Sequence, residues 1–349
     1  MRTSYSKDDV VLLLKDITGM VEPQSTQERE RQIQAGRHYC EMLPIEYVPT
    51  KEYMDVYNEA LDNYSRPTAL AVGVLADRII DKKGKDVVLV SLARAGIPIG
   101  ILLKRYIKKK YDIDVKHYAI SIIRGRGIDK NAMKYLLASY RPEQLQFVDG
   151  WIGKGAILNE LKKEIEAYKG VSYEIAVLAD PANVTELCGT HEDILIPSSC
   201  LNCTVSGLVS RTFLRDDIIG ENDFHGAVYY DELKDKDLSY EFINRIEEMF
   251  DMNSSMPDSR IKGVGVDEVR KIADEYGIDD INLIKPGIGE TTRVLLRRVP
   301  WKVLVCEKYK DDRELAHIIR LAKEKGVPVE YHDLVHYKTC GIIKKLADA

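Results

Sequence analysis

The residue best placed for chemistry is Asp149, which follows an apolar run at 145–148 and precedes a turn spaced by glycines. Gly153 and Gly155 let backbone N–H groups approach an anion closely, and a helix that starts after such a turn favours negative charge. Lys154 adds a positive charge between the two glycines. This stretch therefore predicts a site for a phosphorylated sugar, with Asp149 on a sugar hydroxyl or a metal-bound water. Plain turn chemistry is the alternative, because Asp and Gly are also common in turns that bind nothing.

Arginine-bearing loops flexed by glycine follow two further predicted strands. Arg94 comes after a strand predicted over 86–92, and Arg124 and Arg126 come after one predicted over 117–123. The carboxyl ends of parallel strands meet at one edge of a sheet, so these side chains are expected near one ligand. Guanidinium groups suit an anion clamp or a mobile loop that closes over a site.

Strand and helix patterns alternate through most of the chain, which predicts an α/β fold with a parallel sheet and a second, smaller α/β domain. Helices are also expected over 205–213 and 337–347, where apolar residues recur at helical spacing. The predicted division is 1–65 for a mainly helical extension packing on the first domain, 66–251 for that domain, 252–260 for a linker rich in Asn, Ser and Pro, and 261–349 for the second domain.

Length and composition describe an ordinary soluble protein. The chain has 349 residues, 45% of them hydrophobic and 31% charged, which suits two domains with a large core. Its polar start resembles no signal peptide, and no apolar run is long enough to cross a membrane. Six cysteines are too few for a disulfide framework, so a cytoplasmic location is expected. The net charge of −5 does not point to nucleic acid, although the last ninety residues carry roughly +3.

Cys200 and Cys203 lie in a Ser/Thr/Asn-rich turn between a predicted strand and a predicted helix. A helix N-terminus can lower the pKa of a thiol, so either cysteine could serve as a nucleophile. The bases and orienting acids considered for them are His191, His225, Asp193 and Asp223. No second cysteine pair has the spacing that a zinc site needs, so no metal site is predicted. Inert buried cysteines, or a turn that binds a polar ligand group, are the alternatives.

The strand-end loops of the first domain resemble those of type I phosphoribosyltransferases, which bind phosphoribosyl pyrophosphate (PRPP). The resemblance implies that fold and a transfer of phosphoribose, with Mg²⁺, to or from a base-like acceptor. Asp149 would bind the ribose, Arg94 would bind the pyrophosphate, and Arg124 and Arg126 would close over the site as catalytic residues. Gly150 stands where the family has a second acid, and Gly153-Lys-Gly-Ala156 stands where it has Thr-Gly-Gly-Thr. The phosphate-binding set implied is Ser91, Ala95, Gly96, Gly150, Gly153, Lys154, Gly155 and Ala156.

Almost the whole chain is similar to bacterial proteins from tellurite-resistance and stress gene neighbourhoods. These join a phosphoribosyltransferase-like domain to a C-terminal Pelota-type RNA-binding domain, and some are labelled cysteine protease StiP. Residues 285–293 resemble the Gly-x-Asn-Glu-x-x-Lys element of the L7Ae/Pelota fold, with Gly289 in place of Asn and Arg293 in place of Lys. The RNA-binding residues implied are Lys285, Gly287, Gly289, Glu290, Arg293 and Arg297. A helix with a solvated basic face is the alternative.

Three functions are therefore open. The main hypothesis is a phosphoribosyltransferase coupled to an RNA-binding domain, with PRPP, an unidentified acceptor and RNA as partners. The second is a cysteine hydrolase or protease that uses Cys200 or Cys203. The third is a non-catalytic RNA-binding protein whose first domain senses a phosphosugar. The sequence leaves open whether the chain forms a homodimer, and no membrane partner is expected.

Overall fold

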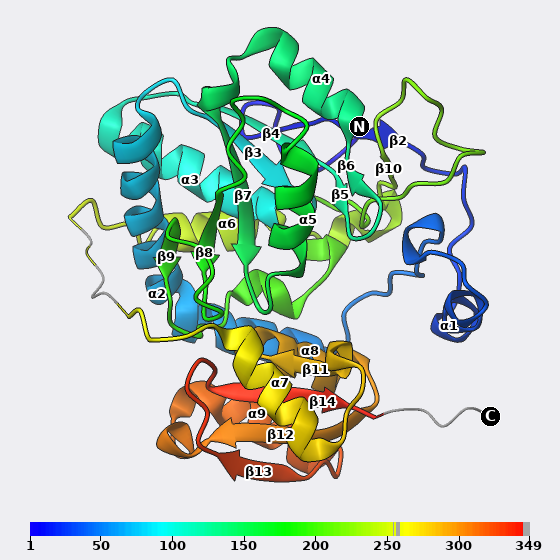
Figure 1. The fold of residues 1–349 in the computed structure, drawn as a ribbon, viewed down its shortest axis with the longest axis vertical. Coiled ribbons are helices and arrows are strands. Elements are labelled where there is room, and N and C mark those ends of the chain that lie inside the picture. Colours follow the sequence, from blue (N-terminus) through cyan, green and yellow to red (C-terminus); the bar gives the residue numbers. More distant parts are fainter. Residues whose placement is uncertain (254, 256–258, 345–349) are drawn as a thin grey trace.

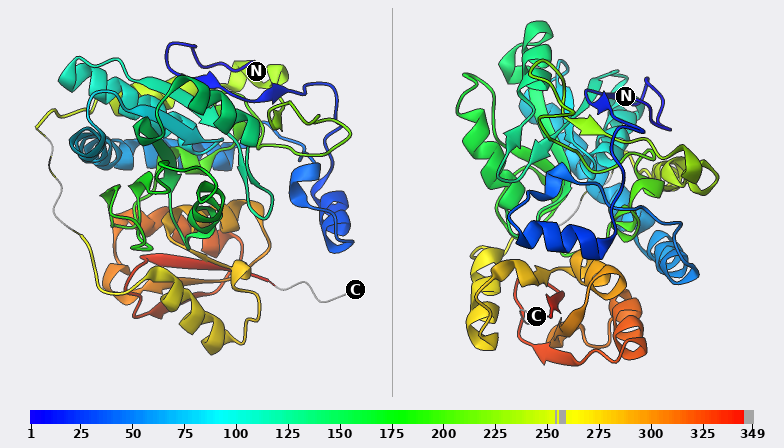
Figure 2. Two further views of the ribbon diagram at one scale, coloured as in Figure 1. Left: turned by 45° about the horizontal axis from the view of Figure 1, so that its top comes forward. Right: turned by 90° about the vertical axis from the view of Figure 1, so that its right-hand side faces the viewer.

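The computed structural model describes residues 1–253, 255 and 259–344. Two α/β units lie one above the other in Figure 1, and the smaller C-terminal unit packs against one end of the larger. Both views of Figure 2 show the same arrangement. The prediction of a parallel-sheet domain followed by a smaller α/β domain is confirmed. Within the described residues, no helix is both long and apolar enough to cross a membrane.

A six-stranded parallel sheet forms the centre of the first unit. In spatial order its strands are β1 (Val11–Leu12), β4 (Lys116–Ile120), β3 (Val88–Leu92), β7 (Leu145–Trp151), β8 (Ile175–Ala179) and β9 (Cys188–Thr190). The central strands are mostly apolar because helices cover both faces of the sheet. Along β3, Val88 and Val90 belong to one core, whereas Leu89 belongs to the core on the opposite face.

Helices pack on the two faces of this sheet (Figure 1). One face is covered by α2 (Lys51–Lys83), α3 (Gly96–Tyr111) and α6 (Ser239–Glu247), and the other by α4 (Lys130–Ser139) and α5 (Ala156–Ile165). Helix α2 runs without a break through positions 65 and 66. Smaller elements of this unit are α1 (Thr26–Gln34), β2 (Lys15–Asp16), β10 (Gly226–Ala227), β5 (Ile122–Ile123) and β6 (Gly127–Ile128).

The second unit has a mixed four-stranded sheet. Its strands, in spatial order, are β11 (Ile284–Pro286), β14 (Thr339–Ile343), β12 (Pro300–Cys306) and β13 (Val329–His332). Strand β14 is antiparallel to both of its neighbours, whereas β12 and β13 are parallel. Its helices are α7 (Gly265–Tyr276), α8 (Ile288–Arg297) and α9 (Ala316–Glu324).

Two predicted helices are wrong. The segment 205–213 is irregular, because Gly207 and Leu208 have positive φ angles of 75° and 56°, which stop a right-handed helix. The segment predicted as a helix over 337–347 contains β14 instead, whose five residues are all buried between β11 and β12. Positions 345–347 lie outside the described residues.

Helix α8 is the main contact between the two units. The Tyr53 hydroxyl on α2 donates to the Leu296 carbonyl at 2.6 Å, and Arg297 donates to the Cys200 carbonyl at 2.6 Å. The Asp193 carboxylate accepts the backbone N–H groups of Ile288 and Lys338 at 3.0 and 2.8 Å. The first unit therefore holds both the start of α8 and the segment leading into β14.

Candidate functional site

The predicted sugar-phosphate loop lies at the contact between the two units. Burial raises the pKa of Asp149 to about 7, and its Oδ1 accepts the N–H of Gly150 at 2.7 Å. The Lys154 ammonium donates to the carbonyls of Ile281 and Ile284 in the second unit, at 2.6 and 2.9 Å. The charge that the sequence assigned to a phosphate is therefore bound to backbone carbonyls across the domain contact.

The remaining residues of the predicted phosphate set lie at the starts of α3 and α5, on the turns beside them, or on the strands β3 and β7 that lead into these turns. The Ser91 hydroxyl is buried and hydrogen-bonds the Gly96 carbonyl at 3.0 Å. A Cβ at Gly96 would lie 2.5 Å from the Val148 carbonyl oxygen, so the start of α3 packs tightly on β7. Ala95 precedes α3, Gly155 precedes α5 with a φ of 84°, and Ala156 opens α5.

The three predicted arginines have protein partners. Arg94 lies 3.3 Å from the Glu46 carboxylate and donates to the Val209 carbonyl at 2.9 Å. Arg126 pairs with Glu41 at 2.7 Å. Arg124 is exposed on the β5–β6 turn and reaches Asn282 of the second unit at 3.4 Å. The structure thus brings Arg94, Arg124 and Asp149 to the same interdomain region, although Arg94 is held by an acid.

Two adjoining cavities occupy this region. One has a volume of about 210 Å³ and includes Arg94, Asp149 and Arg293 in its wall. The other has a volume of about 310 Å³ and includes Arg124 and Lys285. Asp149, Trp151 and Glu290 line both.

The predicted RNA-binding residues lie on β11, α8 and the turn between them. Gly287 precedes α8 with a φ of 92°, and Gly289 faces Ser199 of the first unit. Arg297 donates to both Cys200 and Asn202, so it is committed to the domain contact. Arg293 is 45% exposed and forms an ion pair with Glu290 of its own helix at 2.9 Å. RNA contact by this set stays a prediction.

Neither predicted nucleophile has a base beside it. Cys200 and Cys203 are buried, and burial raises the pKa of each thiol to about 12. Among the hydrogen bonds of residues 1–253, 255 and 259–344, none joins these thiols to a histidine. The bases and acids considered for them bind elsewhere: His225 to Ser121, Asp223 to Lys15, Asp193 to the second unit, and His191 to Cys188.

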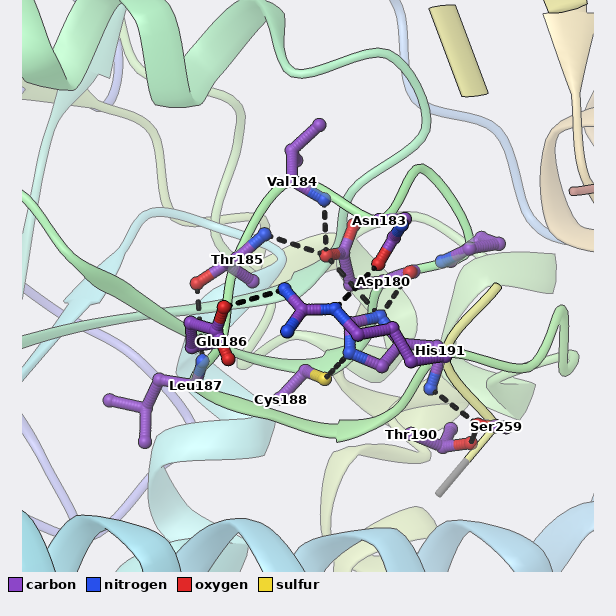
Figure 3. Close-up of polar contacts among 12 residues, drawn as sticks. Asp180, Asn183, Val184, Thr185, Glu186, Leu187, Cys188, Thr190, His191 and Ser259 are labelled. Atoms are coloured by element: carbon purple, nitrogen blue, oxygen red, sulfur yellow. Dashed lines mark hydrogen bonds and ion pairs between the residues drawn. The ribbon is translucent and has the colours of Figure 1, made fainter. Parts of the chain in front are cut away.

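A different thiol does have an ordered base. Strand β8 ends just before Asp180, and the chain returns through a turn to β9, which begins at Cys188 and is followed by His191 (Figure 3). The Cys188 Sγ lies 3.4 Å from Nε2 of His191. The His191 Nδ1 lies 3.0 Å from the Asp180 carbonyl oxygen and 3.6 Å from its Oδ2. A proton on Nδ1 can be donated to Asp180, which leaves Nε2 as an acceptor that faces the thiol.

Burial sets the protonation of this group. The Asp180 carboxylate accepts the N–H groups of Val184 and Thr185 at 2.7 and 2.8 Å, yet burial raises its pKa to about 7. Burial also raises the pKa of Cys188 to about 12, with the nearby Arg78 acting in the opposite direction. While it is buried in this way, the thiol is therefore protonated at neutral pH.

The segment that joins the two units covers this group. The Ser259 hydroxyl accepts the N–H of His191 at 3.0 Å (Figure 3), and Arg260 donates to Glu186 at 2.6 Å. Asn183 donates to the Gly263 carbonyl at 2.6 Å. Cys188 is fully buried beneath these contacts. A bulky molecule can therefore reach the thiol only after some of the contacts around it open.

A second close Cys–His contact joins neighbours on one turn. The Cys40 Sγ lies 2.9 Å from Nδ1 of His38, and burial raises the pKa of this thiol to about 11. Within the described part of the chain, no carboxylate accepts a hydrogen bond from the His38 ring. In the Cys188 group, by contrast, Nδ1 of the imidazole lies 3.0 Å from the backbone carbonyl oxygen of Asp180 and 3.6 Å from its carboxylate.

The sequence contains a short pattern that could have indicated the Asp180, Cys188 and His191 group, but the hydrolase hypothesis did not use it. Cys188-Gly-Thr-His191 places a thiol and an imidazole three residues apart, and Asp180-Pro ends the preceding predicted strand. The hydrolase hypothesis considered His191 or His225 as the base for Cys200 or Cys203, whereas in the structure His191 contacts Cys188.

Buried Asp180 predicts a pH dependence of stability. Its pKa is raised from 3.8 to about 7, so its contribution to folding is complete below about pH 4 and is lost as pH rises through 7. Asp180→Asn cannot ionise, so its melting temperature is expected to fall less than that of the wild type between pH 5 and pH 8. Thermal unfolding followed by circular dichroism at both pH values measures this difference. An equal fall in the melting temperature of the two proteins would contradict a raised pKa for Asp180.

Comparisons with known proteins give the family. Residues 3–247 match the family described as "Tellurite-like stress resistance cysteine protease StiP". A protein named "Cysteine protease StiP" from Acinetobacter baylyi is 36% identical over 367 residues, covering 98% of this chain and 94% of that protein. The chain belongs to the StiP family. Residues 263–345 match the PELOTA RNA binding domain, and no solved structure matches the chain.

The StiP assignment corrects the main functional prediction. The predicted phosphoribosyltransferase activity is wrong, because both the family and the relative are named as cysteine proteases. The PRPP-binding and catalytic roles given to Asp149, Arg94, Arg124 and Arg126 belonged to that activity, as did Mg²⁺. In the part of the chain that the structure describes, no group of three or more His, Cys, Asp or Glu residues could hold a metal ion. Membership of the StiP family favours the cysteine-hydrolase hypothesis over the other two.

Proposed function

We propose that this protein is a cysteine protease in which Cys188 is the nucleophile, His191 the general base and Asp180 the residue that orients the imidazole. One observation carries the proposal: Nε2 of His191 faces the Cys188 Sγ at 3.4 Å, while Nδ1 contacts the backbone carbonyl of Asp180 at 3.0 Å and lies 3.6 Å from its carboxylate. A thiol, an imidazole and an acid in this order are the groups that activate a nucleophilic cysteine. The StiP family name supports the reaction class, and the geometry supports these residues.

The reaction follows from the positions of the protons. His191 takes the thiol proton on Nε2, and the Cys188 thiolate attacks the carbonyl carbon of a peptide bond. The tetrahedral intermediate collapses as the imidazolium returns this proton to the leaving amine, which leaves a thioester on Cys188. His191 then deprotonates a water molecule that attacks the thioester, and the carboxylic acid product leaves as the thiol is restored.

Arg78 is placed to assist the first step. Its Nη1 donates to the Cys188 carbonyl at 2.8 Å and lies 4.0 Å from Sγ. A guanidinium beside the sulfur favours the thiolate over the thiol. Once water enters, the burial that raises the Cys188 pKa is relieved, and Arg78 acts to lower this pKa.

RNA is the partner proposed for the second unit. The match to the PELOTA RNA binding domain covers that unit, and Arg293 presents a partly exposed guanidinium on α8. The function proposed is therefore a protease joined to an RNA-binding domain, instead of an RNA-binding protein whose first domain only senses a small ligand.

Thiol labelling tests the nucleophile. The full chain is treated with iodoacetamide and mapped by mass spectrometry, alone and as Arg260→Ala, which removes the contact with Glu186. Cys188 is expected to be labelled slowly in the wild type and several-fold faster in Arg260→Ala, because the variant loosens the cover. Hydrolysis of fluorescent casein is expected to be lost in Cys188→Ala.

Cys200→Ala and Cys203→Ala serve as matched controls, since each removes one buried thiol without a neighbouring imidazole. They are expected to keep casein hydrolysis. Loss of activity in Cys40→Ala with full activity in Cys188→Ala would move the nucleophile to the His38–Cys40 contact and overturn the assignment.

A further inference from the structure

The cleft between the two units gathers more positive than negative side chains. Arg124 and Lys154 come from the first unit, and Lys285 and Arg293 come from the second. The acids at these cavities are Asp149 and Glu290, and each of them lines both cavities. With Arg94, which also lines the first cavity and is paired with Glu46, five cations therefore face two carboxyl groups across a contact that no single unit could form.

The cations repel one another where they are packed. Burial lowers the pKa of Lys154 to about 8, and the neighbouring Lys285 acts in the same direction. Burial likewise lowers the pKa of Lys285; Glu290 acts against this effect, and Arg298, Arg124 and Arg293 add to it. Like charges held this close favour an anion between them, because a bound anion would offset their repulsion.

An aromatic side chain stands between the two cavities. Trp151, the last residue of β7, lines both of them. A Cβ at Gly153 or at Gly287 would lie 2.6 Å from its indole ring, so a glycine from each unit is needed for the ring to fit. A flat ring beside cations is the pairing that holds a base and its phosphate in single-stranded nucleic acid.

We propose that this cleft is a composite site for single-stranded RNA, in which Trp151 stacks on a base while Arg124 and Arg293 contact flanking phosphates. The first unit would then supply RNA contacts of its own, and the second unit would not bind alone. The inference rests on the RNA partner proposed for the second unit. It does not depend on Cys188.

The test measures RNA binding by the full chain carrying Cys188→Ala, so that hydrolysis cannot interfere. Fluorescence anisotropy with fluorescein-labelled oligouridylate and oligoadenylate gives the dissociation constant at several salt concentrations. Trp151→Ala is expected to weaken binding roughly tenfold, and Trp151→Phe less, since base stacking tolerates another aromatic ring. Arg124→Ala is expected to weaken binding severalfold. The slope of the logarithm of the binding constant against the logarithm of the salt concentration should also become shallower, by about the amount that one phosphate contact contributes.

Trp301→Ala is the matched control, because Trp301 is 39% exposed on β12 and lines neither cavity. Arg124 is exposed on a turn, so Arg124→Ala should fold normally, and weaker binding by this variant cannot be attributed to misfolding. Binding that is lost in Arg293→Ala but unchanged in Trp151→Ala and Arg124→Ala would overturn the composite site and leave RNA binding with the second unit. No binding by the wild type would overturn both RNA proposals and leave the protease proposal standing. A Trp151→Ala variant that binds RNA normally but hydrolyses casein more slowly would assign the cleft to peptide and overturn the inference.

Discussion

His191→Ala is expected to lower kcat/KM for casein hydrolysis by about 10³-fold or more, which is the scale of losing the base that activates a catalytic nucleophile. The expected cause is specific: without Nε2 at 3.4 Å, nothing accepts the Cys188 proton, and the buried thiol keeps its raised pKa. A continuous fluorescence assay with the full chain measures kcat and KM separately. The loss is expected in kcat, because the imidazole holds no part of the substrate in the ground state.

His332→Ala is the control for this variant, since His332 lies on β13 in the second unit. It should retain normal activity. His38→Ala separates the two Cys–His contacts: normal activity in His38→Ala supports Cys188, and a loss equal to that of His191→Ala would contradict the choice between them. Thermal unfolding of each variant shows whether a loss reflects chemistry or folding.

Asp193→Ala is expected to separate the two units and to destabilise the protein by about 2–4 kcal/mol. Its carboxylate accepts the N–H groups of Ile288 and Lys338, and removing it leaves both donors buried without this acceptor. Small-angle X-ray scattering should show a larger radius of gyration, and the melting temperature should fall. Asp311→Ala removes an exposed acid from the second unit and should change neither quantity. An unchanged scattering curve for Asp193→Ala would show that the other contacts of α8 suffice.

The parallel sheet could be predicted from the sequence because burial on both faces makes its central strands nearly continuous apolar runs. Every residue of strands β3 and β8 is buried. In a chain where strand and helix patterns alternate regularly, a short apolar run of this kind is best explained as a strand of a parallel sheet. The residues after position 336 could not be assigned in this way. Their apolar spacing suits a helix, but the gap between β11 and β12 admits an extended strand, so tertiary pairing decided the outcome.

The site was harder to predict because the decisive contacts are made by packing. The spacing of Cys188 and His191 makes a contact between them possible, but whether His191 faces Cys188 or Cys200 depends on how β9 ends. The misleading signal was Lys154 among glycines, which has the composition of a phosphate loop. In the structure it donates to Ile281 and Ile284, so the same composition serves the contact between domains.

The cover formed by Ser259 and Arg260 has a consequence under oxidising conditions. Peroxides attack thiolates much faster than thiols, and they must reach the sulfur to do so. Cys188 is fully buried and its pKa is raised to about 12, so the closed protein presents neither a thiolate nor an exposed sulfur. Inactivation by hydrogen peroxide should therefore track the fraction of molecules in which the segment has moved away. The thiol proposed as the nucleophile would then be protected from oxidation for as long as it stays buried.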